Sequence, residues 1–234
     1  MPVIIGIPIR NDFDSFKIMI NSLINSTDAF DKVVIIESES TDGSKEFSDL
    51  FAKINSKFEV IHTLKEGPLK AYNKLFDIAK KRKCDLLLTQ SDVIFPKCYN
   101  RDWLMEMKYF AQINNIGAVT TWNGGGISGT DYIDKLYWLG GWCTYYPLRT
   151  IERIGRYDES FPNGYGVDID YSYRIKLAKL IIIQINYWVD HHMANSREHD
   201  KDINTEQMKQ DSAKYFRHKY KLGEFAVKKF GGGN

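Results

Sequence analysis

Residues 84–96 read CDLLLTQSDVIFP, in which an apolar run ends in a short polar cluster. The segment DLLLT (85–89) is short, apolar and bounded by polar residues, a pattern that predicts a buried strand. Gln90, Ser91 and Asp92 follow directly, so an amide, a hydroxyl and a carboxylate stand at the tip of that strand. Ligands of open parallel sheets bind outside the carboxyl ends of the strands, so this tip is the first candidate for a site.

The segments upstream show the same strand pattern in alternation with helical patterns. VIIGIPI (3–9), KVVIIES (32–38) and FEVIH (58–62) each predict a buried strand. Strands that alternate with helices over short connections form a parallel sheet with helices on its faces. We therefore predict an α/β fold with a mostly parallel central sheet flanked by helices.

Apolar residues at helical spacing lie between these strands and predict one buried stripe on each intervening helix. Thr41 and Asp42 are expected to cap the second of these helices. The expected stripes are Met19, Ile20, Leu23 and Ile24 on the first helix, Phe47, Leu50, Phe51 and Ile54 on the second, and Leu69, Tyr72, Leu75, Phe76 and Ala79 on the third.

The second half of the chain is less regular. NGGGISGTD (123–131) is rich in glycine and predicts a mobile loop. Helical spacing is found in 103–112, 171–180 and 205–221, and strand patterns are found in 116–121 and in the run LIIIQINYWVDHH that ends in His191 and His192. We expect a single domain in which residues 1–97 and 98–200 form two halves and 201–234 form a helical tail.

The composition excludes several classes of protein. The 234 residues carry a net charge of +2, without the basic excess of nucleic-acid-binding proteins, so we expect no nucleic acid partner. Three scattered cysteines predict free thiols in a reducing compartment rather than a disulfide framework. We see no signal-peptide pattern, and the longest apolar run is too short to cross a bilayer, so we expect a cytoplasmic protein.

Polar residues at the other strand ends extend the candidate site. They are Pro8, Arg10 and Asn11 after the first strand, Glu37, Ser38 and Glu39 after the second, and Gly67 and Lys70 near the start of the third helix. A carboxylate and an amide at the lip of a sheet suit a hard divalent cation that keeps part of its coordination shell for phosphates.

Seven segments in order resemble the family 2-like glycosyltransferases, which have the GT-A fold. They are IPIRN, IIESESTDGS, GPLKAYNK, LTQSDVIFP, GGWCTYYPLRTIERIGRYDESF, GYGVDIDYSYR and VDHH, and the resemblance runs from about Val3 to Ser196. It implies transfer of a sugar from a nucleotide-diphosphate donor, UDP- or dTDP-linked, to a hydroxyl acceptor in glycan or glycoconjugate synthesis, with inversion. By this resemblance, residues 1–97 bind the nucleotide and 98–200 hold the acceptor and the catalytic residue.

The resemblance assigns the metal ligands. QSD is similar to the family's Asp-x-Asp motif with an amide in place of the first acid, so Asp92 is expected to bind Mn²⁺ or Mg²⁺. His191 aligns with a further ligand of the family, with His192 as the alternative, and imidazole favours Mn²⁺. Without the resemblance, the same residues would read as a strand-end turn and a polar loop.

GVDID resembles the family's Glu-Asp-x-Asp segment, which assigns Asp168 as the general base that takes the acceptor's proton. The plainer alternative is that Asp168 and Asp170 only complement the dipole of the following helix. Residues expected to contact the donor are Pro8, Arg10, Glu37, Ser38, Lys70, Asn73, Gln90, Ser91 and Trp142. Trp142 and Trp138 are candidates for stacking on a sugar, and core packing is the alternative for both.

Three residues depart from the family pattern. Gln90 replaces an acid, Val167 replaces the glutamate before Asp168, and Tyr72 stands where arginine is usual, unless Tyr72 is simply a core residue. These departures motivate a second hypothesis, a non-catalytic GT-A-like nucleotide-sugar binding protein. A nucleotidyltransferase is disfavoured because IPIRNDFD is not a glycine-rich, basic loop.

The C-terminal tail combines basic and aromatic residues in KYFRHKYKLG (214–223). Such a helix can lie on an anionic membrane surface, so weak membrane-surface contact is one expectation. The other expectation, which we favour, is that this helix packs on the domain or faces solvent.

Overall fold

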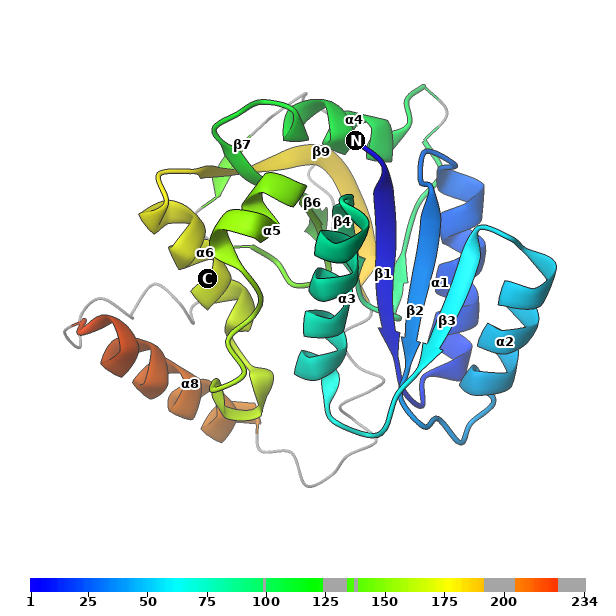
Figure 1. The fold of residues 1–234 in the computed structure, drawn as a ribbon, viewed down its shortest axis with the longest axis horizontal. Coiled ribbons are helices and arrows are strands. Elements are labelled where there is room, and N and C mark those ends of the chain that lie inside the picture. The colour runs from blue at the N-terminus through cyan, green and yellow to red at the C-terminus, as the bar shows by residue number, and fades with distance from the viewer. Residues whose placement is uncertain (99, 124–133, 137–138, 192–204, 223–234) are drawn as a thin grey trace.

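The structure is a computed structural model that describes residues 1–98, 100–123, 134–136, 139–191 and 205–222 (Figure 1). Its first half alternates β1 (Val3–Ile9), α1 (Phe13–Ser26), β2 (Lys32–Glu37), α2 (Ser44–Ile54), β3 (Phe58–His62), α3 (Pro68–Arg82) and β4 (Asp85–Thr89). These four strands are parallel and lie in the order β3-β2-β1-β4. The predicted α/β alternation is confirmed, with strand bounds close to those read from the sequence.

The second half contains β5 (Val93–Ile94), α4 (Trp103–Ala111), β6 (Ile116–Asn123), β7 (Asp134–Leu136), β8 (Cys143–Tyr146), α5 (Leu148–Ile154), the short 3-10 helix η1 (Pro162–Gly164), α6 (Val167–Leu177), β9 (Ile181–His191) and α8 (Thr205–Tyr220). Strand β8 lies between β4 and β6 and is antiparallel to both, whereas β9 is parallel to β6. Strands β5 and β7 pair antiparallel with β9. The sheet is therefore mixed.

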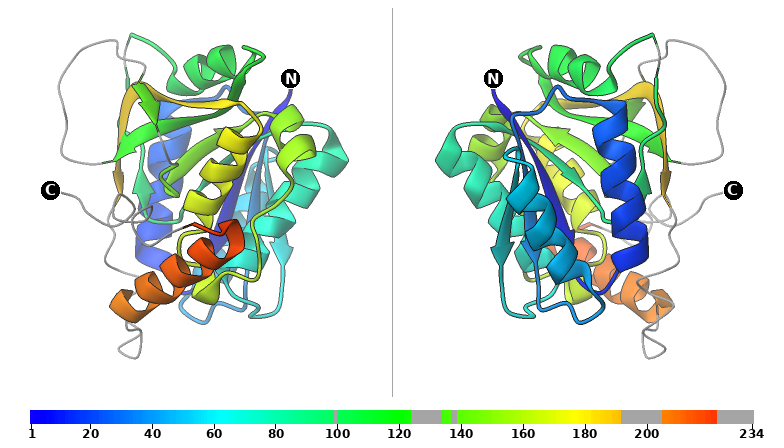
Figure 2. Two further views of the ribbon diagram at one scale, coloured as in Figure 1. Left: turned by 90° about the vertical axis from the view of Figure 1, so that its left-hand side faces the viewer. Right: turned by 90° about the vertical axis from the view of Figure 1, so that its right-hand side faces the viewer.

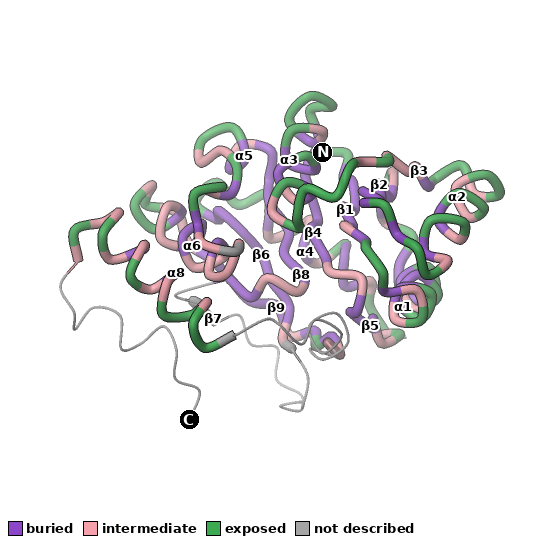
Figure 3. Tube along the Cα trace, turned by 90° about the horizontal axis from the view of Figure 1, so that it is seen from below, coloured by how far each residue is buried: buried purple, intermediate pink, exposed green. Residues whose placement is uncertain are grey.

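Helices cover both faces of this sheet, because successive residues of a strand point to opposite faces (Figures 1 and 2). Val3, Ile5 and Ile7 of β1 pack toward α1, α2 and α4, and Ile4 packs toward α3, α5 and α6. Figure 3 looks from below, toward the end where β1 stops, and shows buried strands between helices whose outer faces are exposed. Both layers bury continuous apolar surface, which stabilises the sheet edge that carries the polar residues.

The helical stripes are confirmed except at their solvent edges. Phe47 and Phe51 of α2 pack against the core, but Leu50 and Ile54 are 59% and 70% exposed, because this short helix covers only the outer strands β2 and β3. In α1, the expected stripe is buried apart from Ile24, which is 39% exposed.

The expected cap at Asp42 serves two helices. Asp42 Oδ1 accepts a hydrogen bond from the Ser44 amide at the start of α2, at 3.0 Å. Its Oδ2 accepts from the Phe13 amide at the start of α1, at 2.8 Å. Since the first amides of a helix have no partner within the helix, one carboxylate satisfies a donor on each. The STDGS turn thereby joins the loops that follow β1 and β2.

Within the described residues, no helix has both the length and the apolar character needed to cross a bilayer.

Close packing between β1 and α3 depends on Gly6. A Cβ at this position would lie 2.8 Å from Leu75 Cδ1, and Leu75 is fully buried. We predict that Gly6→Ala lowers the free energy of unfolding by about 1–3 kcal/mol in urea titrations, because the added methyl overfills the interface. In a Leu75→Ala background the same change should cost less; an equal cost in both backgrounds would show that the contact does not limit packing.

Candidate functional site

The ends of β4 and β9 meet at one point of the sheet edge. Val93 of β5 pairs with His191, the last residue of β9, and this places Asp92 beside the histidine. His191 Nε2 lies 2.7 Å from Gln90 Oε1 and 3.3 Å from Asp92 Oδ1. Gln90 and His191 are 101 positions apart in the chain, so the fold assembles this group from two distant segments.

His191 is only partly satisfied by these contacts. The Gln90 oxygen can only accept, so Nε2 carries the proton in this arrangement, and a cation bound at Nε2 would take the place of that proton. Nδ1 is buried, and among the described residues it has no hydrogen-bond partner. A buried nitrogen without a hydrogen-bond partner is energetically costly. We therefore expect His191 to have a further partner that is not among the described protein atoms.

This group of side chains fits a divalent cation that is shared with a phosphorylated ligand. Asp92 and Gln90 offer oxygens and His191 offers a nitrogen, a donor set that suits Mn²⁺. Within the described part of the chain, no three His, Cys, Asp or Glu side chains gather as a complete metal site. A cation held here would need further ligands, and phosphate oxygens are typical ones.

The segment before β8 connects this group to Asp168. The side-chain Nε2 of Gln90 donates to the Gly141 carbonyl at 3.1 Å, and the backbone N–H of Gln90 donates to the Trp142 carbonyl at 3.2 Å. A Cβ at Gly141 would lie 3.5 Å from Asp168 Oδ2 and 3.6 Å from Gln90 Nε2. The carboxylate of Asp168 and the side-chain amide of Gln90 therefore both lie close to the same glycine.

Asp168 lies in the first turn of α6, which follows Gly166 in the left-handed region at a φ of 78°. Its Oδ1 accepts from the Ile169 amide at 2.9 Å. Asp168 therefore bonds an amide at the start of α6 and also lies beside the candidate site. Tyr146 and Tyr157 share a hydrogen bond of 2.8 Å nearby. Burial chiefly raises the pKa of both phenols, and the charge of Asp168 raises it further, so both stay neutral.

Asp12 belongs to the site and was not predicted. Its Oδ2 accepts from the Ser91 hydroxyl at 2.7 Å, and the residue is 8% exposed. Burial raises the pKa of Asp12, and the charge of Asp92 contributes in the same direction. The signal was present in the sequence, since Asp12 is the third residue after a buried strand that ends at the same edge.

The predicted nucleotide contacts at the end of β2 turn inward. Glu37 is 1% exposed; its Oε1 accepts from the Ser40 amide at 2.6 Å and its Oε2 is 2.9 Å from His62 Nδ1. Ser38 Oγ is 3.0 Å from Thr63 Oγ1. Glu37 is almost fully buried, and its bond to the Ser40 amide holds the STDGS turn in shape.

The remaining donor candidates differ in how accessible they are. Pro8 lies in β1 opposite Ile36, and Arg10 is exposed just beyond the strand. Lys70 lies inside α3, half-exposed, with Nζ 3.6 Å from Glu66. Asn73 is 2% exposed.

Asn73 is already engaged with another part of the protein. Its Nδ2 donates to the Tyr157 carbonyl and to Glu159 Oε1, and its Oδ1 accepts from the Tyr157 amide at 2.9 Å. Both amide hydrogens are used, so Asn73 ties α3 to the segment before η1 rather than facing the group around Asp92.

A model of the family described as glycosyl transferase family 2 matches residues 4–133, more than half of the chain. The chain belongs to glycosyltransferase family 2. A comparison with curated protein sequences found no match.

Solved structures with the GT-A fold are similar in shape and distant in sequence. GalNAc-T7, solved with UDP, GalNAc and Mn²⁺, has a TM-score of 0.69 at 14% identity over 82% of this chain and 44% of its own. The mannosyltransferase PcManGT from Pyrobaculum calidifontis, solved with GDP-Man and Mn²⁺, has a TM-score of 0.67 at 15% identity, over 95% of this chain and 65% of its own. S. aureus TarS 1-349, solved with UDP, has a TM-score of 0.61 at 15% identity, over 97% of this chain and 74% of its own. This chain spans less than two thirds of the first two.

The departures from the family 2 pattern occupy structural positions. Tyr72 is partly buried and its ring meets that of Tyr157 edge to face, with centroids 5.9 Å apart. Val167, the first residue of α6, is 7% exposed and packs in the core. The core alternative for Tyr72 thus has direct support, and Val167 leaves Asp168 as the acid nearest the site in this segment.

Trp142 is partly buried against the core, and its Nε1 donates to the Thr121 carbonyl at 3.2 Å. Its ring centroid lies 6.3 Å from that of His191. His192, Trp138 and most of the predicted loop 123–131 lie outside the described residues.

The two glycines before Trp142 should respond differently to alanine. A Cβ at Gly140 would lie 2.0 Å from the Trp142 ring, whereas at Gly141 it would make ordinary contacts. We predict that Gly140→Ala costs about 1–3 kcal/mol of unfolding free energy and alters the near-ultraviolet circular dichroism. Gly141→Ala should change stability by less than about 0.5 kcal/mol. Equal costs would contradict the placement of the ring.

His62 predicts a pH-dependent stability. Its hydrogen bond to Glu37 is the main cause of a pKa raised above the ordinary 6.5, with Asp49 contributing on the other side of the ring. The resulting stabilisation is complete below the unfolded-state pKa and is lost as pH rises through the folded-state pKa.

The Tm advantage of the wild type over His62→Gln should therefore shrink as the pH rises above the ordinary histidine pKa of 6.5. Glutamine keeps a donor for Glu37 but cannot carry the charge, and Asp49→Asn is the control that removes only the charge of the outer partner. A pH-independent difference would contradict the assignment.

Proposed function

We propose that this chain transfers a sugar from a nucleoside-diphosphate-sugar donor to a hydroxyl acceptor, with inversion at the anomeric carbon. The observation that supports it most is the bridge made by Gln90, which contacts His191 through its oxygen and Gly141 through its nitrogen. Gly141 in turn adjoins the Asp168 carboxylate. A candidate base and a candidate cation site are therefore both close to Gly141, in a member of glycosyltransferase family 2.

Asp168 is the residue proposed to take the acceptor's proton. A hydroxyl is a weak nucleophile until its proton is removed during attack, and a carboxylate beside it can accept that proton. The acceptor oxygen forms a bond to the anomeric carbon as the bond to the nucleoside diphosphate breaks. Trp142 and Gly141 line the approach between Gln90 and Asp168.

Asp92 and His191, with Gln90 beside them, are the residues that would hold Mn²⁺, or Mg²⁺. When bound, such an ion offsets the negative charge of the departing diphosphate. Asp12 supports this arrangement through Ser91, the residue before Asp92. Because the protein supplies few ligands, we propose that cation and nucleotide bind together.

Arg10 and Lys70 are the exposed cations proposed to meet the diphosphate, with Ser38 and Pro8 near the nucleoside. UDP and dTDP remain the proposed carriers, since the resemblance that assigns the site favours them. Structures of similar shape contain UDP or GDP-Man, so a donor panel should include guanosine sugars as well.

A non-catalytic nucleotide-sugar binding protein is the second candidate. The buried Val167 favours it, because an acid that many relatives place beside the base is replaced here by a core side chain. Tight binding of a nucleotide sugar without turnover of any donor would select this candidate over the first.

Asp168→Asn tests the proposed base. The amide keeps the shape and can still accept the Ile169 amide bond, but it cannot take a proton. We predict a kcat lowered by about 10²–10⁴-fold, with nucleotide affinity measured by calorimetry unchanged. Asp14→Asn, in an exposed part of α1, is the matched control and should retain full activity. Transfer by Asp168→Asn at the wild-type rate would exclude the assignment.

Thermal stabilisation tests the proposed cation site. UDP with Mn²⁺ should raise the Tm more than the sum of the two added separately, because each supplies part of the other's binding site. Asp92→Asn should abolish this synergy, and EDTA should reverse it. If Asp92→Asn keeps the synergy, the cation binds elsewhere.

A further inference from the structure

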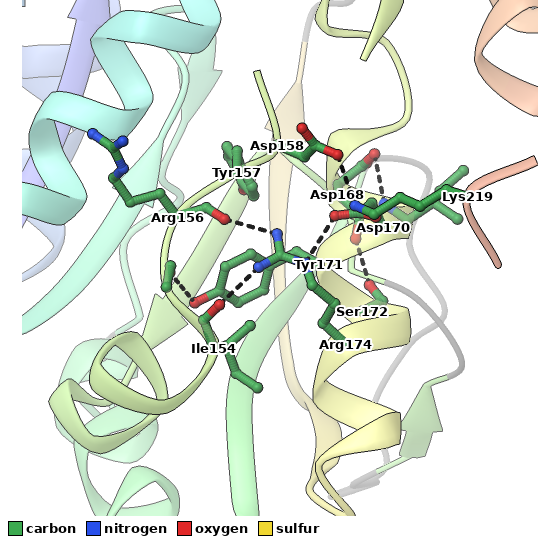
Figure 4. A network of polar contacts seen from close by, with 12 residues as sticks. Ile154, Arg156, Tyr157, Asp158, Asp168, Asp170, Tyr171, Ser172, Arg174 and Lys219 are labelled. Carbon is green, nitrogen blue, oxygen red and sulfur yellow. Dashed lines mark hydrogen bonds and ion pairs between the residues drawn. The ribbon is translucent and has the colours of Figure 1, made fainter. Parts of the chain in front are cut away.

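The C-terminal helix α8 contacts the catalytic half through two carboxylates (Figure 4). Lys219 Nζ lies 2.6 Å from Asp170 Oδ1 and 2.7 Å from Asp158 Oδ2. Tyr220 donates its hydroxyl to Asp170 at 2.7 Å, and Tyr215 donates to Asp158 at 3.1 Å. Asp170 lies in α6 and Asp158 lies between α5 and η1, so α8 connects these two segments.

Asp170 is fully buried and needs these partners. Its exposure is 0%, and its other oxygen is bonded to Arg174 Nε, one turn further along α6, at 2.9 Å. A buried carboxylate that loses a cation is strongly destabilised. Burial alone would raise the pKa of Asp158, but the bond and charge of Lys219, together with the bonds from the Ser160 amide and Tyr215, outweigh it and lower the pKa to about 2. Both carboxylates contact the Lys219 ammonium directly.

The same helical turn carries Asp168. The Ser172 hydroxyl donates to the Asp168 carbonyl at 2.6 Å and accepts from the Leu139 amide, which anchors the turn on the side of the glycines. Arg174 also donates to the carbonyls of Ile154 and Arg156, both at 2.8 Å. The turn is thus held by Leu139 on one side, by the end of α5 on another, and by α8 through Asp170.

We propose that Lys219 is a positioning residue for Asp168: by holding Asp170 and Asp158 together, it fixes the first turn of α6 and with it the carboxylate that faces Gly141. This inference rests on the proposed function and gives the basic helix α8 a role in the reaction. Since Asp168 and Asp170 are two positions apart on a helix, they point in different directions, and the one facing α8 sets the placement of the other.

Lys219→Met tests this role, because methionine keeps the apolar stem and removes the charge. We expect kcat to fall by about tenfold to a hundredfold, the effect of a displaced catalytic group, while UDP affinity stays within about twofold. Lys219→Arg should retain most of the activity. Lys214→Met, an exposed lysine of the same helix, is the matched control and should behave as wild type.

Amide hydrogen exchange gives a readout that needs no donor or acceptor. Residues 166–172 should exchange at least tenfold faster in Lys219→Met than in wild type or Lys214→Met, since the turn opens locally. Unchanged exchange there overturns the inference even if the chain proves to be a binding protein. Faster exchange in an active protein whose kcat is unchanged also overturns it. If Lys219→Met does not fold, Tyr220→Phe, which removes one bond to Asp170, takes its place with the same expected directions.

Discussion

Buried carboxylates must be paired, and this constraint organises the edge of the sheet where the site lies. Glu37 is paired with His62 and a backbone amide, Asp12 with Ser91, and Asp170 with Arg174 and Lys219. Each pairing connects a strand end or helix start to another segment. Asp92, which lies beside His191, and Asp168, which lies close to Gly141, are the acids at this end of the sheet that we propose for the chemistry.

The central position of Gln90 follows from the antiparallel strand β8. Because β8 lies between β4 and β6, the loop before it, with Gly140, Gly141 and Trp142, returns to the tip of β4. The amide of Gln90 can then donate to that loop and accept from β9 at once. An aspartate at this position would lack the donor, so the amide that departs from the family pattern also has a structural use here.

The sequence predicted the first half of the fold well because β-branched runs and turn residues determine it locally. Through the order of family segments it also predicted Asp92 and His191 as neighbours, which they are, whereas their role as ligands and that of Asp168 as base stay predictions. It did not reveal that Glu37 points inward, since its partner His62 ends a different strand. The sequence indicated only a local role for Asp170 at the start of its helix, whereas its partner Lys219 lies 49 positions away. Long-range pairing of this kind leaves no periodic pattern in a single sequence.

We propose that Asp92 and His191 hold a divalent cation together with the diphosphate of a nucleotide donor. The most direct measurement is a crystal structure of the protein with Mn²⁺ and UDP. The account predicts manganese anomalous density at Asp92 and His191, in contact with the phosphates of UDP. Nucleotide bound at another place, with no manganese at Asp92, would contradict it.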